Sequence, residues 1–113
     1  MRKLLLASAL LLAGCAGMET TTDIVMGESM VASDPGISVY VRNKRPASMT
    51  SFSAEKTVLF VHGATYPSET AFDLPLGGVS WMDYIARAGY DVYLVDVRGY
   101  GRSTRPPGMD QPA

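Results

Sequence analysis

The stretch TVLFVHGA, residues 57–64, places a continuous apolar and β-branched run directly before a His-Gly pair. A run without alternation is typical of a strand that helices cover on both faces of a parallel sheet. We therefore predict a central strand over Thr57–Val61. Residues that follow such a strand lie beyond its carboxyl end, which is where ligands bind in open α/β sheets.

A helix and a second strand follow in the sequence. Ser80 and Asp83 match a helix-capping pattern, and Gly89 offers a C-terminal cap. Four apolar residues recur between them at helical spacings: Trp81, Met82, Ile85 and Ala88. Tyr90–Val97 is the second apolar run. Strand, crossover helix and strand form a parallel βαβ unit, so Asp96–Ser103 should lie at the same sheet edge as the His-Gly pair.

The flanking segments carry weaker patterns. Turn residues at 34–36 precede an alternating run, Ile37, Val39 and Val41, which predicts a half-buried strand. Residues 44–53 are expected to form a polar loop, and residues 65–78 a long loop. The aromatic residues of the long loop, Tyr66 and Phe72, could contact an apolar substrate group or pack on the loop and helix. Three strands of this kind would leave Tyr90–Val97 with an unpaired edge.

The amino-terminal residues have the pattern of a secretory signal. Arg2 and Lys3 precede the apolar run Leu4–Leu12, which is too short for a transmembrane helix. Leu12–Cys15 resembles the bacterial lipobox, in which the cysteine is acylated and becomes the new amino terminus. The alternative is a free or buried thiol at Cys15 after an ordinary signal.

This pattern predicts three regions: a lipoprotein signal peptide over residues 1–14, a lipidated tether over 15–35 and a partial domain over 36–113. The single cysteine allows no internal disulfide. We expect a lipid-anchored protein of the bacterial envelope, and Ala16 weakly favours the outer membrane. Ten basic and eleven acidic residues are interspersed, so the membrane contact would depend on acyl chains, and nucleic acid is not an expected partner.

Three motifs together resemble the α/β-hydrolase family: Val61–Ala64, then Gly89-Tyr90, then DVRGYGRS at residues 96–103. The resemblance covers Ile37 to Arg105. It implies an α/β fold class, here the N-terminal part of an α/β-hydrolase sheet with about three strands and one crossover helix, incomplete in this chain.

The resemblance implies a role for the His-Gly loop. In the family, the residue after the His-Gly pair donates one backbone N–H to the oxyanion hole, and that residue here is Ala64. His62 and Gly63 would be the scaffold of this loop, with Gly63 allowing a sharp bend if its φ is positive. His62 as general base is the alternative, but the family order places the catalytic histidine after the nucleophile and the acid.

No nucleophile is found in the 113 residues, because the elbow Gly-x-Ser-x-Gly is absent. Gly101-Arg102-Ser103-Thr104-Arg105 is a near match that lacks the closing glycine, so we interpret Ser103 as a hydroxyl that bonds loop backbone. Gly27–Val31 also contains a near match, in the expected tether. Asp96 could be a catalytic acid, but at the matching family position the carboxylate more often fixes the turn.

No cofactor or metal is predicted. Gly99 and Gly101 lack the third glycine of a dinucleotide loop, and one histidine with one cysteine makes no metal cluster. We expect an N-terminal fragment of a serine hydrolase acting on esters, amides or related bonds of a small-molecule substrate, inactive by itself. An aspartate elbow, with epoxide or halide chemistry, stays open. The alternative is a complete, non-catalytic envelope lipoprotein that acts as a binding or structural module.

Overall fold

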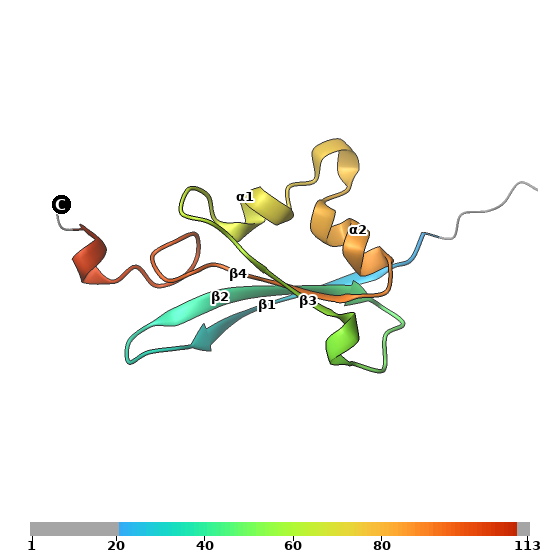
Figure 1. The fold of residues 1–113 in the computed structure, drawn as a ribbon, viewed down its shortest axis with the longest axis horizontal. Helices are drawn as coiled ribbons and strands as arrows, with labels where there is room; N and C mark the ends of the chain where they lie inside the picture. Colours follow the sequence, from blue (N-terminus) through green and yellow to red (C-terminus); the bar gives the residue numbers. More distant parts are fainter. Residues whose placement is uncertain (1–20, 111–113) are drawn as a thin grey trace, which may run out of the picture.

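The computed structural model describes residues 21–110, so the predicted signal peptide and Cys15 lie outside the described part of the chain. It contains a four-stranded sheet in the order β1-β2-β4-β3. The strands are β1 (Ile24–Ala32), β2 (Ser38–Pro46), β3 (Thr57–Val61) and β4 (Asp91–Val95), and the helices are α1 (Ser68–Phe72) and α2 (Trp81–Arg87). Short 3-10 turns cover Ala54–Lys56, Leu76–Gly78 and Pro107–Asp110. Both α-helices lie on the same side of the sheet (Figure 1).

The predicted βαβ unit is confirmed. β3 and β4 are parallel and in register from Thr57 opposite Asp91 to Val61 opposite Val95. α2 lies on the crossover that connects them. β2 pairs antiparallel with both β1 and β4, so the sheet is mixed. This is a mixed α/β architecture, as the sequence predicted, with one more strand than expected.

The predicted start of α2 is also confirmed. The Ser80 side chain accepts the Asp83 N–H at 2.9 Å, and the Asp83 carboxylate accepts the Ser80 N–H at 3.1 Å. This capping box satisfies two of the N–H groups that a helix start leaves without partners. Gly89 follows the helix with φ of 95°, which is the left-handed conformation of a C-terminal cap.

The prediction of an irregular tether is wrong for Ile24–Ala32, which forms β1. This strand pairs with β2 along its whole length, from Ile24 opposite Pro46 to Ala32 opposite Ser38. Most of its side chains are exposed, so no apolar alternation marks it in the sequence. The hydrogen bonds of an antiparallel partner stabilise it instead. The polar loop also begins later than predicted, because β2 continues to Pro46.

β3 was predicted to be central, but it is an edge strand of the described sheet. β4 lies between β2 and β3 and therefore has no unpaired edge, contrary to expectation. Phe60 is buried beneath the helices, whereas Leu59 and Val61 are 60% and 53% exposed. Side chains alternate along a strand, so these two lie on the face that no described helix covers.

The core lies between the sheet and the helices. Buried apolar side chains from β2, β3, α2 and β4 form it: Tyr40, Phe60, Met82, Ala86, Val92 and Leu94. The predicted long loop over residues 65–78 contains α1, whose Phe72 ring stacks on Phe60 with centroids 4.4 Å apart. Phe72 thus packs on the core, while Tyr66 is 62% exposed. No helix among residues 21–110 is both long and apolar enough to span a bilayer.

Candidate functional site

The loops that follow β3 and β4 meet at one edge of the sheet, as the parallel βαβ unit predicted. The N–H of Val97, just after β4, donates to Nε2 of His62, just after β3, at 2.9 Å. The His62 ring also packs against the Tyr100 ring, with centroids 4.8 Å apart. The carboxyl ends of two strands are therefore joined by side-chain contacts at the place where α/β sheets bind ligands.

His62 is 7% exposed, and both of its ring nitrogens are engaged. Because Nε2 accepts the Val97 N–H, the neutral imidazole carries its proton on Nδ1. Nδ1 then donates to the carbonyl oxygen of Gly63 at 2.6 Å. A ring with both nitrogens held by backbone has no free acceptor for a proton from a nucleophile, which favours the scaffold interpretation over that of a general base.

The backbone N–H and the backbone carbonyl of Ala64 differ in their hydrogen bonding. The carbonyl oxygen of Ala64 accepts the Tyr100 hydroxyl at 2.8 Å. Among the hydrogen bonds of residues 21–110, none uses the Ala64 N–H. Gly63 does not have the positive φ that we considered, and a Cβ there would meet nothing within 4 Å. The bend at this loop therefore does not require a glycine.

Asp96 is 2% exposed and holds two backbone segments. Its Oδ1 accepts the N–H of Ser68 at the start of α1, at 2.9 Å, and its Oδ2 accepts the N–H of Arg102 at 3.0 Å. A Cβ on Gly101, whose φ is 49°, would lie 2.0 Å from this Oδ2. The carboxylate occupies the space that a side chain at 101 would need, and it fixes the turn as we had interpreted.

Ser103 is a buried link between the turn and β2. Its hydroxyl donates to the Asp96 carbonyl oxygen at 2.5 Å and accepts the Tyr40 N–H at 2.8 Å. Both contacts are to backbone, in agreement with the interpretation of Ser103 as a structural hydroxyl. No general base lies among these partners, so the geometry offers no means to activate it as a nucleophile.

A charged cluster on the helix side of β2 was not predicted. At its centre Asp73, with a side chain 1% exposed, pairs with Arg42 and Lys44, each at 2.6 Å. The Ser80 hydroxyl donates to the same carboxylate at 2.6 Å, and Lys44 also pairs with Asp83 at 2.6 Å. The signal in the sequence is the alternation along β2, which places residues 40, 42 and 44 on one face.

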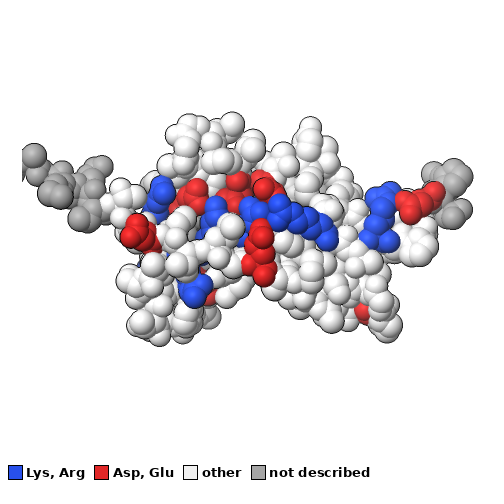
Figure 2. Space-filling model, turned by 180° about the vertical axis from the view of Figure 1, so that it is seen from behind, with Lys and Arg blue, Asp and Glu red and all other residues white. Residues whose placement is uncertain are grey.

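The cluster continues toward β1 and the turn after β4. Glu28 accepts hydrogen bonds from Tyr40 and Arg42, and these bonds lower the pKa of its carboxyl to about 2. Arg102 extends the cluster by pairing with Glu28 at 2.8 Å and with Glu69 at 3.0 Å. Blue and red side chains accordingly lie next to one another across the middle of the view in Figure 2. These contacts fasten α1 and the turn to the β1-β2 hairpin.

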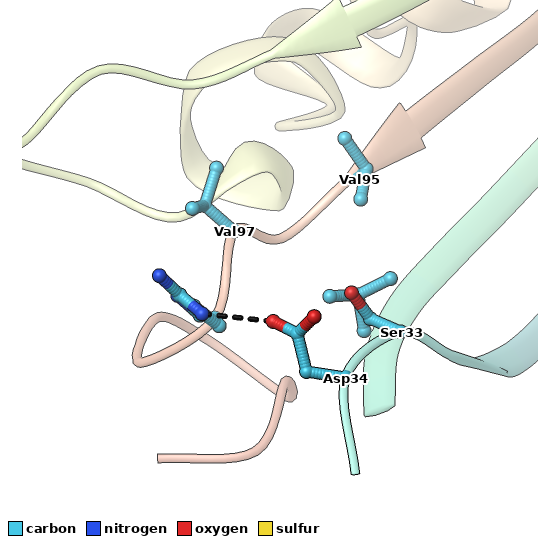
Figure 3. Close-up of a pocket in the computed structure, with 6 residues that line it drawn as sticks. Ser33, Asp34, Val95 and Val97 are labelled. Carbon is cyan, nitrogen blue, oxygen red and sulfur yellow. Dashed lines mark hydrogen bonds and ion pairs between the residues drawn. The ribbon is translucent and has the colours of Figure 1, made fainter. Parts of the chain in front are cut away.

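A hollow of about 370 Å³ lies on the side of the sheet opposite the helices. Six residues line it: Ser33, Asp34, Val39, Val95, Val97 and Arg98. Asp34 and Arg98 form an exposed ion pair at 2.9 Å at its rim (Figure 3). Sequence patterns did not indicate this hollow. Within residues 21–110, His, Cys, Asp and Glu side chains form no group of three that could hold a metal ion.

Comparison with known proteins finds a similarity to one fold family. A sequence model of the alpha/beta hydrolase fold family matches residues 56–110. Residues 56–110 are therefore similar to part of that fold. A solved structure described as a novel bacterial esterase is 21% identical, with a TM-score of 0.49, over 99% of this chain. The chain spans 40% of the length of that esterase. No curated protein matches the chain.

Proposed function

We propose that the chain is the N-terminal part of a serine-type hydrolase and supplies the Ala64 N–H to an oxyanion hole. The observation that carries the proposal is the orientation of one peptide unit. His62 holds the Gly63 carbonyl, and the N–H of a trans peptide points opposite to its carbonyl, so the Ala64 N–H points away from the ring. The family match over residues 56–110 supports hydrolase chemistry at this edge.

The proposed chemistry is acyl transfer from an ester, amide or related bond. The tetrahedral intermediate carries a negative oxygen, and a positioned backbone donor contributes about 3 kcal/mol to its stabilisation. The second donor and the Ser-His-acid triad are not present in these 113 residues, because Gly-x-Ser-x-Gly is absent and His62 is the single histidine. They would come from further polypeptide. An aspartate nucleophile on the same fold remains the second option.

The first prediction concerns the 113-residue chain by itself. We expect no hydrolysis of p-nitrophenyl butyrate above background, and no labelling of Ser103 by a fluorophosphonate, because Ser103 bonds only backbone. The product of the reading frame continued past codon 113 serves as the comparison, and we expect it to encode the elbow and to turn over esters. Turnover by the short chain, or a labelled Ser103, would refute this assignment.

A non-catalytic envelope module is the second candidate, and the exposed sheet face favours it. Leu59 and Val61 lie on the edge strand β3 with their side chains open to solvent, so this face could bind a partner. One observation would distinguish the two candidate functions. A natural stop at codon 113, together with a folded product of this length, would support the module and contradict the hydrolase.

We further propose that Cys15 anchors the protein to the bacterial envelope, with the periplasmic face of the outer membrane favoured. The prediction is that the mature amino-terminal peptide begins at Cys15 and carries the mass of several acyl chains, since one chain alone binds membranes only marginally. Mass spectrometry of that peptide measures it, and Cys15→Ser should abolish incorporation of labelled fatty acid. A mature chain with an unmodified Cys15 thiol would place the protein in the periplasm or outside the cell.

A further inference from the structure

We propose that Tyr100 is a positioning residue for the oxyanion loop, an inference that rests on the proposed function. The Tyr100 hydroxyl donates to the Ala64 carbonyl oxygen at 2.8 Å, and its ring packs on His62 at 4.8 Å between centroids. The proposed donor at Ala64 does not by itself assign a role to Tyr100. Its contacts nevertheless end on the two residues that define that donor.

The two contacts hold two successive peptide units. His62 Nδ1 holds the carbonyl of the 63–64 unit, and the Tyr100 hydroxyl holds the carbonyl of the 64–65 unit. Each trans peptide is planar, so holding its oxygen also sets the direction of its N–H. The N–H groups of Ala64 and Thr65 are therefore directed by two side chains from different loops. With both planes held, the φ and ψ of Ala64 have little freedom left.

Tyr100 can do this because its own backbone is fixed. Its N–H donates to the Val97 carbonyl at 3.0 Å, and its carbonyl accepts the Ser103 N–H at 3.0 Å. The N–H of Val97 in turn donates to His62, so a chain of hydrogen bonds connects His62 through Val97 and Tyr100 to Ala64. Glycines on both sides of Tyr100 have positive φ, 87° at 99 and 49° at 101, which permits the tight turn that carries the ring.

The consequence for the proposed chemistry is preorganisation. A donor that is already aimed at the developing negative charge needs no reorganisation when the intermediate forms. Without the hydroxyl, the 64–65 peptide unit could rotate while the 63–64 unit stayed on His62. Tyr100 therefore limits the motion of the segment that contains the Ala64 donor, without itself contacting substrate.

NMR of the full ¹⁵N,¹³C-labelled chain tests the proposal with Tyr100→Phe, which keeps the ring and removes the hydroxyl. We expect the N–H order parameters of Ala64 and Thr65 to fall from about 0.85 to below about 0.6, and the Ala64 carbonyl ¹³C resonance to shift. The His62 ring nitrogens should keep their tautomer, because the bonds to Gly63 and Val97 remain. A general loss of stability would not produce this local signature.

Tyr66→Phe is the matched control, since Tyr66 lies in the same loop and is 62% exposed. Unchanged order at residues 64 and 65 in Tyr100→Phe, or an equal change in Tyr66→Phe, would overturn the proposal. The experiment distinguishes failure of this proposal from failure of the hydrolase assignment. If Tyr100→Phe loosens the loop but the reading frame encodes no nucleophile, the positioning role of Tyr100 stands and the hydrolase function is refuted. If the loop is unaltered and the product of the continued reading frame is active, the hydrolase function stands and the positioning role is refuted.

Discussion

Asp73→Ala is expected to lower the free energy of unfolding by about 3 kcal/mol, because it removes one partner from a buried cluster of charges. The Asp73 side chain is 1% exposed and pairs with both Arg42 and Lys44. Each cation keeps another carboxylate, Glu28 for Arg42 and Asp83 for Lys44, so we expect the lower end of the range for broken buried pairs. A domain of this size is stable by about 5–15 kcal/mol, so the loss would be a large fraction.

Urea unfolding followed by circular dichroism measures the effect, and a fall of more than about 1 M in the midpoint is expected. Asp34→Ala is the control, because Asp34 also pairs with an arginine, Arg98, but both side chains are about 60% exposed. An exposed pair contributes at most about 1 kcal/mol. Equal midpoints for the two variants would show that burial of the Asp73 cluster does not matter for stability.

Gly101→Ala is expected to lower the free energy of unfolding by about 2–4 kcal/mol. The same substitution should also displace the Asp96 carboxylate at the candidate site. Its φ of 49° lies in the left-handed region, which costs a residue with a Cβ about 1–2 kcal/mol. The new Cβ would also lie 2.0 Å from the Asp96 Oδ2, so the carboxylate must move. Asp96 would then release the N–H groups of Ser68 and Arg102, and the buried Ser68 N–H would be left without a partner.

Thermal unfolding and amide hydrogen exchange measure this second effect, with faster exchange expected at Ser68 and Arg102. Gly63→Ala is the control within the neighbouring loop. Its φ is not positive, and a Cβ there meets nothing within 4 Å, so we expect a change within about 0.5 kcal/mol. If Gly63→Ala were as damaging as Gly101→Ala, the steric argument at Gly101 would fail.

The βαβ unit and its capped helix could be predicted because their signals are local. The Ser80 and Asp83 pair and the Gly89 cap mark the two ends of one helix, and a helix that connects two apolar runs predicts that these runs form parallel strands. β1 could not be predicted, since its exposed side chains show no periodic pattern and its stabilising hydrogen bonds come from β2. Likewise, the run at Thr57–Val61 reads as central, but the place of a strand in the sheet depends on which neighbours pair with it.

The candidate site divides in the same way. Motif order alone pointed to His62 and Ala64, and it argued against Ser103 and Asp96 as catalytic groups. The contact of Tyr100 with Ala64 joins residues 36 positions apart, and the link from His62 to Val97 joins residues 35 apart. Neither local sequence predicts these contacts, because they depend on the register of two parallel strands.

By itself, then, the sequence determined the βαβ unit, the family resemblance, the absence of a nucleophile elbow and the loop that carries the proposed donor. Only the tertiary structure decided that β3 is an edge strand, that Asp73 pairs with Arg42 and Lys44 of β2, and that His62 and Tyr100 hydrogen-bond to the carbonyl oxygens of Gly63 and Ala64. The physical reason is the separation along the sequence of the residues that interact. Caps, turns and apolar runs act between near neighbours, whereas strand order, buried ion pairs and side-chain contacts between loops arise only when distant segments pack together.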